Sequence, residues 1–224
     1  MQNNKFYSST QQGSQVDEGL RNYMLKVYNY MGLGVAFTGI VILLLANMPE
    51  VMTFLAVSPF KWVVFLGVLG MGWFSPRILT MQNGSLAQMY YWTYAALWGV
   101  LISPMVVYYL NVEGGVYDVA RAFLITSGMF AGISIFGYTT KKNLTGLGQF
   151  CIMAVIGLFL AGIVQMLFFE ASTSFSLIFS VLAVLLFAGM TAYETQVIKD
   201  MYLHNSRGGE AVSRMAVLGA LMIY

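Results

Sequence analysis

The chain is dominated by long apolar runs that are separated by short polar segments. Six runs are long enough to cross a bilayer as a helix, and they lie near Val27–Met48, Phe54–Phe74, Leu86–Leu110, Val116–Tyr138, Leu147–Phe169 and Phe175–Ile198. A crossing helix needs about 20 residues, and only helices or closed barrels satisfy their backbone hydrogen bonds in lipid. The alternation over about ten residues that marks a barrel strand is absent from the sequence. These runs therefore predict an all-α polytopic membrane protein.

The residue composition also indicates a chain embedded in a membrane. Hydrophobic residues make up 58% of the 224 residues and charged residues only 9%, against roughly 45–50% and 25% in soluble domains. The formal net charge is +2, and no basic patch with interleaved aromatic residues is present. The expected surrounding is therefore the lipid bilayer, and nucleic acid is not expected as a partner.

The two ends of the chain differ from its middle. Residues 1–25 begin with the polar stretch "MQNNKFYSSTQQGSQVDEGL" and are interpreted as a cytoplasmic tail, while residues 26–224 are interpreted as one transmembrane helical domain. A seventh apolar segment begins near Ala211, and at Tyr224 it is still too short to span. We therefore expect a seven-helix transmembrane bundle whose seventh helix continues in a longer chain.

Basic residues divide unevenly between the two sides of the predicted bundle. Nine of the eleven share one side: Lys5, Arg21, Lys26, Arg77, Lys141, Lys142, Lys199, Arg207 and Arg214. Only Lys61 and Arg121 fall on the other side. Because cytoplasmic segments of membrane proteins carry an excess of Lys and Arg, the amino terminus is expected in the cytoplasm.

Small and aromatic residues suggest how the spans are arranged. Gly128 with Gly132, and Gly157 with Ala161, are small residues four positions apart, a spacing typical of close helix approach in lipid. The aromatic cluster at residues 90–94 is interpreted as a belt at the membrane interface. We assign none of these residues to a ligand.

One carboxylate interrupts the sixth apolar run. Glu194 stands in the word "AYETQ", about five residues before Lys199, or roughly 7–8 Å along a helix. An ionised Glu in hydrocarbon is unfavourable by several kcal/mol unless it is paired, protonated or facing water, so such a residue is a candidate for function. The alternative is an interfacial Glu that tilts toward water and is hydrogen-bonded to Thr191 or Gln196.

Signals of enzyme chemistry are missing from the sequence. Neither an HExxH nor a GxSxG motif occurs, and the one histidine, His204, lies outside the predicted spans. A metal site made by His204 with Asp200 or Glu210 is the alternative to a solvated histidine in a loop. We therefore expect neither an enzyme nor a bound cofactor.

Three stretches carry a resemblance to a known family. They are "GYTTKKNLTGLGQF" at Gly137–Phe150, "FAGMTAYETQVIKDMY" at Phe187–Tyr202 and "AVLGALMIY" at Ala216–Tyr224. Together they resemble the transmembrane Bax-inhibitor-motif family, in particular its bacterial membrane branch, from about Arg21 to Tyr224. The resemblance implies a seven-helix bundle in a bacterial inner membrane, with a pair of carboxylates on the sixth and seventh helices near the cytoplasmic mouth.

The resemblance also assigns roles to two residues of this chain. Glu194 matches the first carboxylate of the pair, although this family word usually has Asp at that position. The second carboxylate is expected soon after Tyr224. Arg77 matches an arginine at the end of the second span that can pair with the sixth-helix carboxylate, and its alternative role is a cytoplasmic anchor that reaches lipid headgroups.

The function implied by the resemblance is a pH-sensitive calcium leak. Two carboxylates in a confined site cannot both ionise without a large cost, so they share a proton. Loss of that proton would open the cytoplasmic mouth and offer oxygen ligands, Glu194 among them, to calcium. The alternative that the family implies is a non-conducting regulatory membrane protein, which binds and modulates a membrane-bound protease or the stress or cell-death machinery.

Overall fold

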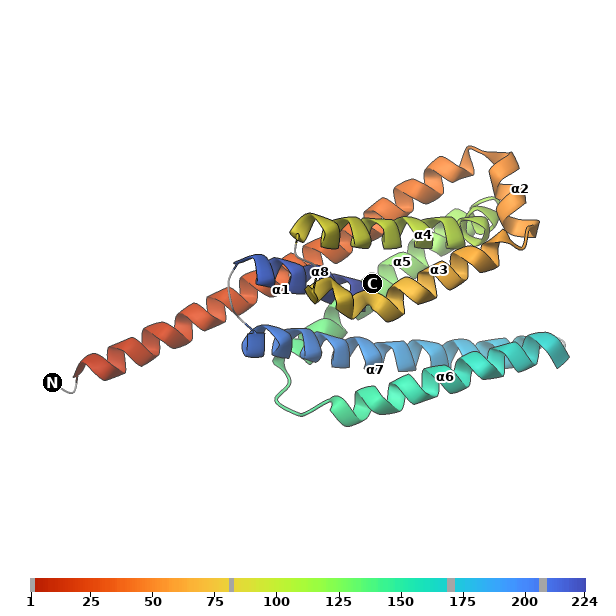
Figure 1. Ribbon diagram of the computed structural model, residues 1–224. Coiled ribbons are helices and arrows are strands. Elements are labelled where there is room, and N and C mark those ends of the chain that lie inside the picture. Colours follow the sequence, from red (N-terminus) through yellow and green to blue (C-terminus); the bar gives the residue numbers. More distant parts are fainter. Residues whose placement is uncertain (1–2, 81–82, 169–171, 206–208) are drawn as a thin grey trace. The chain divides into compact units, whose positions relative to one another are not determined.

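The computed structural model describes residues 3–80, 83–168, 172–205 and 209–224, and the described chain is helical (Figure 1). The elements are α1 Asn3–Ala46, α2 Pro49–Val57, α3 Phe60–Phe74, η1 Ser75–Thr80, α4 Gly84–Leu110, α5 Gly115–Thr139, α6 Thr145–Phe168, α7 Thr173–Asn205 and α8 Gly209–Ile223. Here η1 is a short 3-10 helix. The predicted all-α fold is confirmed.

Most of these helices have the length and composition of membrane spans. Five of them are long and apolar enough to cross: α1 from Glu18, α4, α5, α6 as far as Gln165, and α7 as far as His204. A sixth crossing results when α2 and α3 are taken as one bent span, and Ala211–Ile223 is a shorter apolar helix. The chain is thus a multi-pass membrane protein. The predicted seven-helix bundle agrees with these six crossings and the shorter apolar helix.

The second predicted span, Phe54–Phe74, is not one straight helix. The axis bends by 79° between Pro49–Val57 and Phe60–Ile78. Ser58 has an extended backbone, with φ −70° and ψ 146°, and Pro59 follows it. Proline has no N–H for the helical hydrogen bond, and it disfavours helical geometry in the residue before it. Hydropathy alone did not reveal this break because Ser58 and Pro59 hardly lower the average of the run.

The first helix is longer than the first predicted span. It begins at Asn3 and therefore runs through the segment that was predicted as a polar tail. Its side chains are described from Glu18 onward. The helix continues without a break into the apolar run that starts near Val27. The division between a cytoplasmic tail and a membrane domain at residue 25 stays a prediction.

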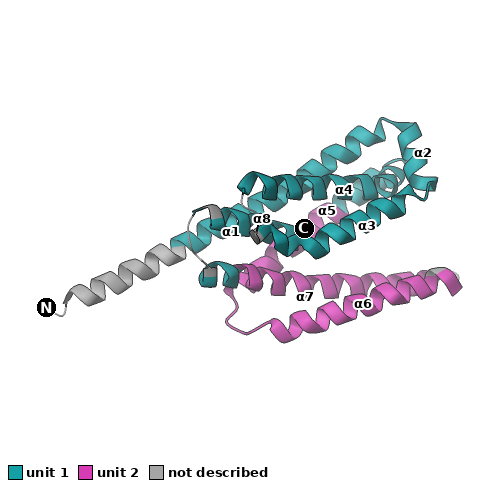
Figure 2. Ribbon diagram, in the orientation of Figure 1, with its two compact units in different colours: residues 1–121, 199–224 teal, residues 122–198 magenta. Residues whose placement is uncertain are grey.

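The chain divides into two compact units, of residues 1–121 with 199–224 and of residues 122–198 (Figure 2). In the first unit α8 lies against α1, α4 and η1. The α8 residues at 215–218, 220 and 221 are all buried. A short helix that is covered in this way gains its stability from tertiary packing, because its length alone is marginal for a helix.

Hydrogen bonds from hydroxyl groups join α1 to its neighbours in this first unit. The Tyr23 hydroxyl donates to the Met215 carbonyl of α8 at 3.3 Å. Thr38 Oγ1 donates to the Ala95 carbonyl of α4 at 2.8 Å. Tyr23 and Thr38 are both buried, so each bond satisfies a polar group that water does not reach.

Two residues of the aromatic cluster at 90–94 lie inside the protein. Tyr91 is fully buried and Tyr94 is only 8% exposed. The Tyr91 hydroxyl donates to the Tyr30 carbonyl of α1 at 2.7 Å. The interpretation as an interface belt is therefore wrong for Tyr91 and Tyr94. The Tyr91 ring packs against Tyr30 of α1 and the Tyr94 ring against Tyr224, and periodicity does not reveal which helices are neighbours.

In the second unit the close helix contacts occur at glycines other than the predicted ones. A Cβ atom added to Gly128, Gly132 or Gly157 would have no described atom within 4 Å. A Cβ on Gly189 of α7 would instead lie 2.8 Å from Cys151 Sγ of α6. The expectation of close packing at the predicted glycines is wrong within this unit, because spacing identifies a face of a helix without identifying its neighbour.

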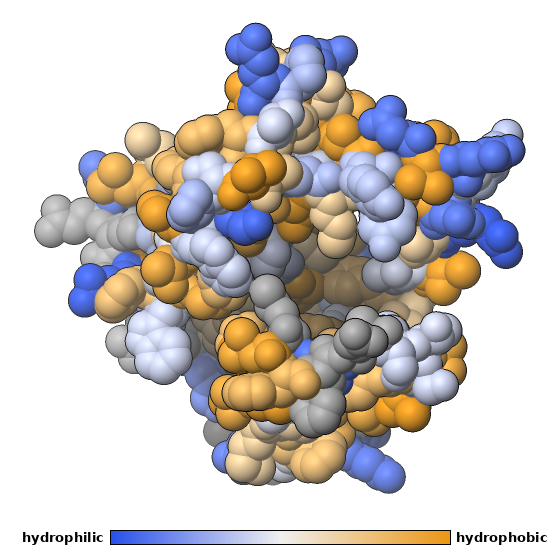
Figure 3. Space-filling model, turned by 90° about the vertical axis from the view of Figure 1, so that its right-hand side faces the viewer, coloured by the Kyte–Doolittle hydropathy of each residue, from blue (hydrophilic) through white to orange (hydrophobic). Residues whose placement is uncertain are grey.

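Large hydrophobic side chains are exposed along the spans, as contact with lipid requires. Leu124 on α5 and Leu185 on α7 are 69% and 63% exposed. On the side of the molecule that carries α2, hydrophobic residues lie among hydrophilic ones at the surface (Figure 3). Such a mixture is typical of the end of a bundle that stands at the membrane interface.

Candidate functional site

The word "AYETQ" lies on α7 in the second unit, where two of its residues pack against α5. Ala192 and Thr195 are buried, at 3% and 0% exposure. A Cβ added to Gly137 of α5 would lie 2.5 Å from the Ala192 carbonyl oxygen and 3.0 Å from Thr195 Cβ. Only glycine leaves room for so close an approach of the two backbones. Ala192 and Thr195 are therefore structural.

Tyr193 makes the corresponding contact with α6. A Cβ added to Gly148 would lie 2.3 Å from Cγ of the Tyr193 ring. The ring therefore rests directly on the α6 backbone at a glycine. Gly137 and Gly148 both belong to the stretch "GYTTKKNLTGLGQF", so the contacts with "AYETQ" explain two residues of that stretch.

Gln196 holds the loop between α5 and α6 with both ends of its amide. Its Oε1 accepts a hydrogen bond from the Leu144 N–H at 2.8 Å, and its Nε2 donates to the Lys142 carbonyl at 2.9 Å. The Asn143 side chain accepts a further hydrogen bond from the Thr145 N–H at 2.8 Å. These bonds satisfy backbone groups at the start of α6. The first N–H groups of a helix need such partners, because no preceding turn provides carbonyl groups for them.

Glu194 differs from its neighbours in the word. It is partly buried, yet no hydrogen bond or ion pair joins it to any residue in the described ranges. At 3.6 residues per turn it lies roughly 200° around α7 from Ala192, so it points away from the side that packs on α5. Glu194 is thus the one member of "AYETQ" to which the packing of this unit gives no role.

The interfacial alternative for Glu194 required a hydrogen bond to Thr191 or Gln196. Thr191 Oγ1 donates instead to the Phe187 carbonyl of its own helix at 2.8 Å. The Gln196 amide is occupied by Leu144 and Lys142. The hydrogen bonds that would make Glu194 a satisfied surface residue are therefore not formed.

Arg77 lies in η1, in the first unit, and is exposed. Its guanidinium carbon stands 4.6 Å from the centre of the Phe74 ring, which is the geometry of a cation–π contact. The contact places the guanidinium end of Arg77 over the Phe74 ring at the end of the second span. The pairing of Arg77 with Glu194 stays a prediction, since the two residues belong to different units.

His204 shows the geometry of an ordinary helix-end residue. Its Nδ1 lies 2.8 Å from the Asp200 carbonyl, one turn earlier in α7. Among the side chains that the structure describes, no three His, Cys, Asp or Glu residues lie together as metal ligands would. The Glu210 side chain, the other partner considered for His204, lies outside the described residues.

The comparison with protein families gives the same family that the three quoted stretches resemble. The family described as "Inhibitor of apoptosis-promoting Bax1" matches residues 20–224. The chain belongs to this Bax inhibitor family. The match includes the glycines of α5 and α6 that receive the "AYETQ" residues, and also Glu194 itself.

Bacterial relatives of this Bax inhibitor family protein cover nearly all of its length. A protein of Rickettsia prowazekii is 31% identical over 220 residues, which are 98% of this chain and 90% of the relative. A protein of Caulobacter vibrioides is 35% identical over 93% of this chain and 84% of its own length. The inner membrane protein YbhL of Escherichia coli K12 is 31% identical over 92% of this chain and 86% of its own length.

Two residues of the site, Gly137 and Gly148, were not singled out by sequence reasoning, and Gln196 was considered only as a partner of Glu194. All three lie inside the quoted family stretches, which was the signal available. Their partners are up to 58 positions away in the chain, counting from Gly137 to Thr195, so no local pattern could have named them. Spatial proximity was needed to show that the two stretches form one packed unit.

Proposed function

We propose that this Bax inhibitor family protein is a pH-sensitive calcium leak channel of a bacterial inner membrane, with Glu194 as a proton-sensing carboxylate. The inner-membrane placement is supported by the description of the Escherichia coli relative. The role of Glu194 is supported by one observation above all. It is the partly buried ionisable residue of "AYETQ", no hydrogen bond or ion pair joins it to a described residue, and its neighbours have packing contacts or hydrogen bonds that it does not share.

A carboxylate in this position is unfavourable for stability. Glu194 lies within the apolar span Thr173–His204, where a charge without a partner loses hydration. A neutral side chain such as glutamine or leucine would avoid this cost. Ionisable residues that stay in such places line ion or proton paths or face water-filled cavities. Function is therefore the better explanation for a Glu at position 194.

The proposed mechanism is a carboxylate latch. Glu194 shares a proton with the second carboxylate that the family resemblance implies, and the shared proton holds the sixth and seventh spans together. When the proton leaves, repulsion between the two carboxylates separates the spans and opens the cytoplasmic mouth. The freed oxygen atoms then provide passing calcium with the hard ligands that it prefers. Calcium flux should accordingly rise as the pH rises through the titration of the pair.

The test is calcium flux into proteoliposomes across a pH series. Glu194→Gln keeps nearly the same volume and removes the charge and the titration, so the pH dependence of flux should flatten. Glu113→Gln is the matched control, because Glu113 lies exposed in the turn between α4 and α5. Its pH dependence should match that of the wild type.

Two outcomes would reject the latch. One is a Glu194→Gln variant that keeps both the wild-type flux and its pH midpoint, and the other is a wild-type protein without flux at any pH. In either case the non-conducting regulator, which binds a membrane-bound protease or the stress machinery, would become the better account. A regulator that docks through the polar residues 1–19 should depend on that segment and tolerate Glu194→Gln.

A further inference from the structure

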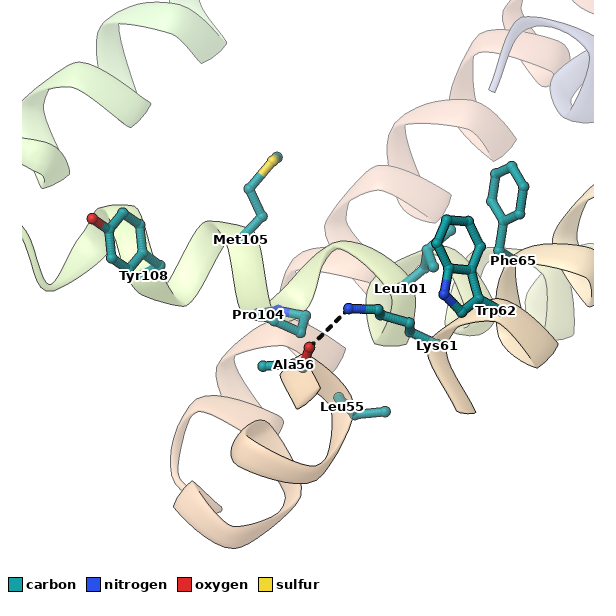
Figure 4. A pocket seen from close by; sticks show the side chains of 9 residues that line it. All are labelled: Leu55, Ala56, Lys61, Trp62, Phe65, Leu101, Pro104, Met105 and Tyr108. Atoms are coloured by element: carbon teal, nitrogen blue, oxygen red, sulfur yellow. Dashed lines mark hydrogen bonds between the residues drawn. The ribbon is translucent and has the colours of Figure 1, made fainter. Parts of the chain in front are cut away.

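A hollow of about 540 Å³ lies between α2, α3 and α4 in the first unit (Figure 4). Its apolar wall includes Leu55 of α2, Trp62 and Phe65 of α3, and Leu101 and Met105 of α4. The volume falls in the range of about 300–1,000 Å³ that is usual for ligand sites. The 79° bend between α2 and α3 separates these helices enough to leave the space.

Lys61 is the charged residue of this hollow. Figure 4 shows its side chain extending from the start of α3 toward Pro104 of α4 and Ala56 of α2. Its Nζ donates one hydrogen bond, of 3.0 Å, to the Ala56 carbonyl. Within the described ranges no carboxylate pairs with Lys61. Since an ammonium group has three donors, two remain for an acceptor in the hollow.

The place of Lys61 on α3 strengthens the preference for an anion. The residue is in the first turn of this 15-residue helix, where the free backbone N–H groups already produce a positive potential. A cation at this end of a helix is therefore unfavourable by itself. A bound anion would neutralise both the ammonium group and the helix end.

The hollow stands at the end of the spans, where lipid headgroups are expected. The first span ends at Ala46, and α4 ends at Leu110. The hollow is lined by residues of α2, of the start of α3 and of the last turns of α4, so it lies near these helix ends. Trp62 and Tyr108 line it and are exposed, as aromatic residues at an interface often are. By the distribution of basic residues, Lys61 lies on the side away from the cytoplasm.

We propose that this hollow binds an anionic glycerophospholipid of the leaflet that faces away from the cytoplasm. The phosphate accepts hydrogen bonds from Lys61 Nζ, and one acyl chain lies against Phe65 and Leu101. A small soluble anion would gain nothing from the apolar wall. A zwitterionic lipid would leave the charge of Lys61 less completely neutralised. The bound lipid thus contacts both α3 and α4 beside the bend between α2 and α3.

The test is lipid titration of the purified protein followed by native mass spectrometry, with phosphatidylglycerol and phosphatidylcholine as the two probes. The wild type should prefer phosphatidylglycerol. Lys61→Gln should bind it about fivefold more weakly, because one Lys near an anionic headgroup contributes on that scale. Lys61→Arg keeps the charge and should retain the preference. Met105→Trp should weaken binding because the larger side chain fills the hollow.

Two matched controls complete the design. Lys141→Gln removes an exposed Lys from a loop of the other unit, and Met153→Trp enlarges an exposed residue of α6. Both should bind phosphatidylglycerol like the wild type. Thermal unfolding of each variant checks that the fold is kept, and because Lys61 and Met105 are exposed, little change is expected.

Three results would overturn the lipid site. They are wild-type affinity in Lys61→Gln, an equal loss of affinity in Lys141→Gln, and equal affinity of the wild type for the two lipids. Glycerol phosphate is added as a competitor to distinguish the sources of the anion. If it displaces phosphatidylglycerol at equal concentration, the site recognises a free phosphate and the acyl chain plays no part.

Discussion

The Leu144 backbone N–H donates a hydrogen bond of 2.8 Å to Gln196 Oε1, across 52 residues of sequence. This bond connects the start of α6 to the second half of α7, and the same glutamine also bonds the Lys142 carbonyl. Gln196 stands two residues after Glu194 in the chain. The position of the loop between α5 and α6 is thereby tied to the helix that carries the proposed proton sensor.

Replacing Gln196 by Leu should loosen the start of α6. The change leaves the Leu144 N–H without its acceptor, and an unsatisfied group of this kind costs about 1–3 kcal/mol. Hydrogen exchange of the Leu144 amide should accelerate by about tenfold or more as a result. Thr139→Val is a suitable control, because Thr139 Oγ1 bonds only within its own helix. Unchanged exchange at Leu144 would show that the hydrogen bond from Leu144 to Gln196 contributes nothing.

Gly137→Ala should destabilise the second unit by about 1–3 kcal/mol, because the added Cβ would stand 2.5 Å from the Ala192 carbonyl oxygen. Backbone atoms cannot move aside as the end of a flexible side chain can. Gly132→Ala, on the same helix, meets no described atom within 4 Å and should be neutral or slightly stabilising. Thermal unfolding in detergent compares the two variants. Equal stability would contradict the close α5–α7 contact.

Arg77→Gln should move the pH midpoint of calcium flux without abolishing the flux. Removal of a nearby cation makes a carboxylate pair hold its proton more tightly, so deprotonation and opening should require a higher pH. The same proteoliposome series measures this shift. A midpoint that stays in place would assign Arg77 to headgroup anchoring and exclude an ion pair with Glu194.

The amino terminus should lie in the cytoplasm and the turn after α4 on the opposite side. Glu113→Cys, in a Cys151→Ser background, should react with a membrane-impermeant maleimide only from the non-cytoplasmic side. Cys151 is buried against Gly189, so serine is the smallest practical change there. Labelling of position 113 only from the cytoplasm would reverse the orientation.

The sequence was sufficient for the features that depend on the chain and its solvent alone. Lipid cannot bond the backbone, so apolar runs of about 20 residues must be helices, and the spans near Leu86–Leu110 and Val116–Tyr138 are found within a few residues of the predicted limits. The free-energy cost of placing a carboxylate in hydrocarbon identified Glu194 as a candidate in the same way. Both follow from local composition.

Only the tertiary structure decided which residues meet. Gly132 and Gly137 lie on the same helix, yet only Gly137 touches α7. Tyr91 is buried by α1, and the partners of Gln196 lie more than 50 positions away. A helical period describes how one helix divides its residues among its faces, whereas the partner of each face depends on contacts between distant segments. The packing of "AYETQ" around Glu194 could therefore not be predicted from the sequence.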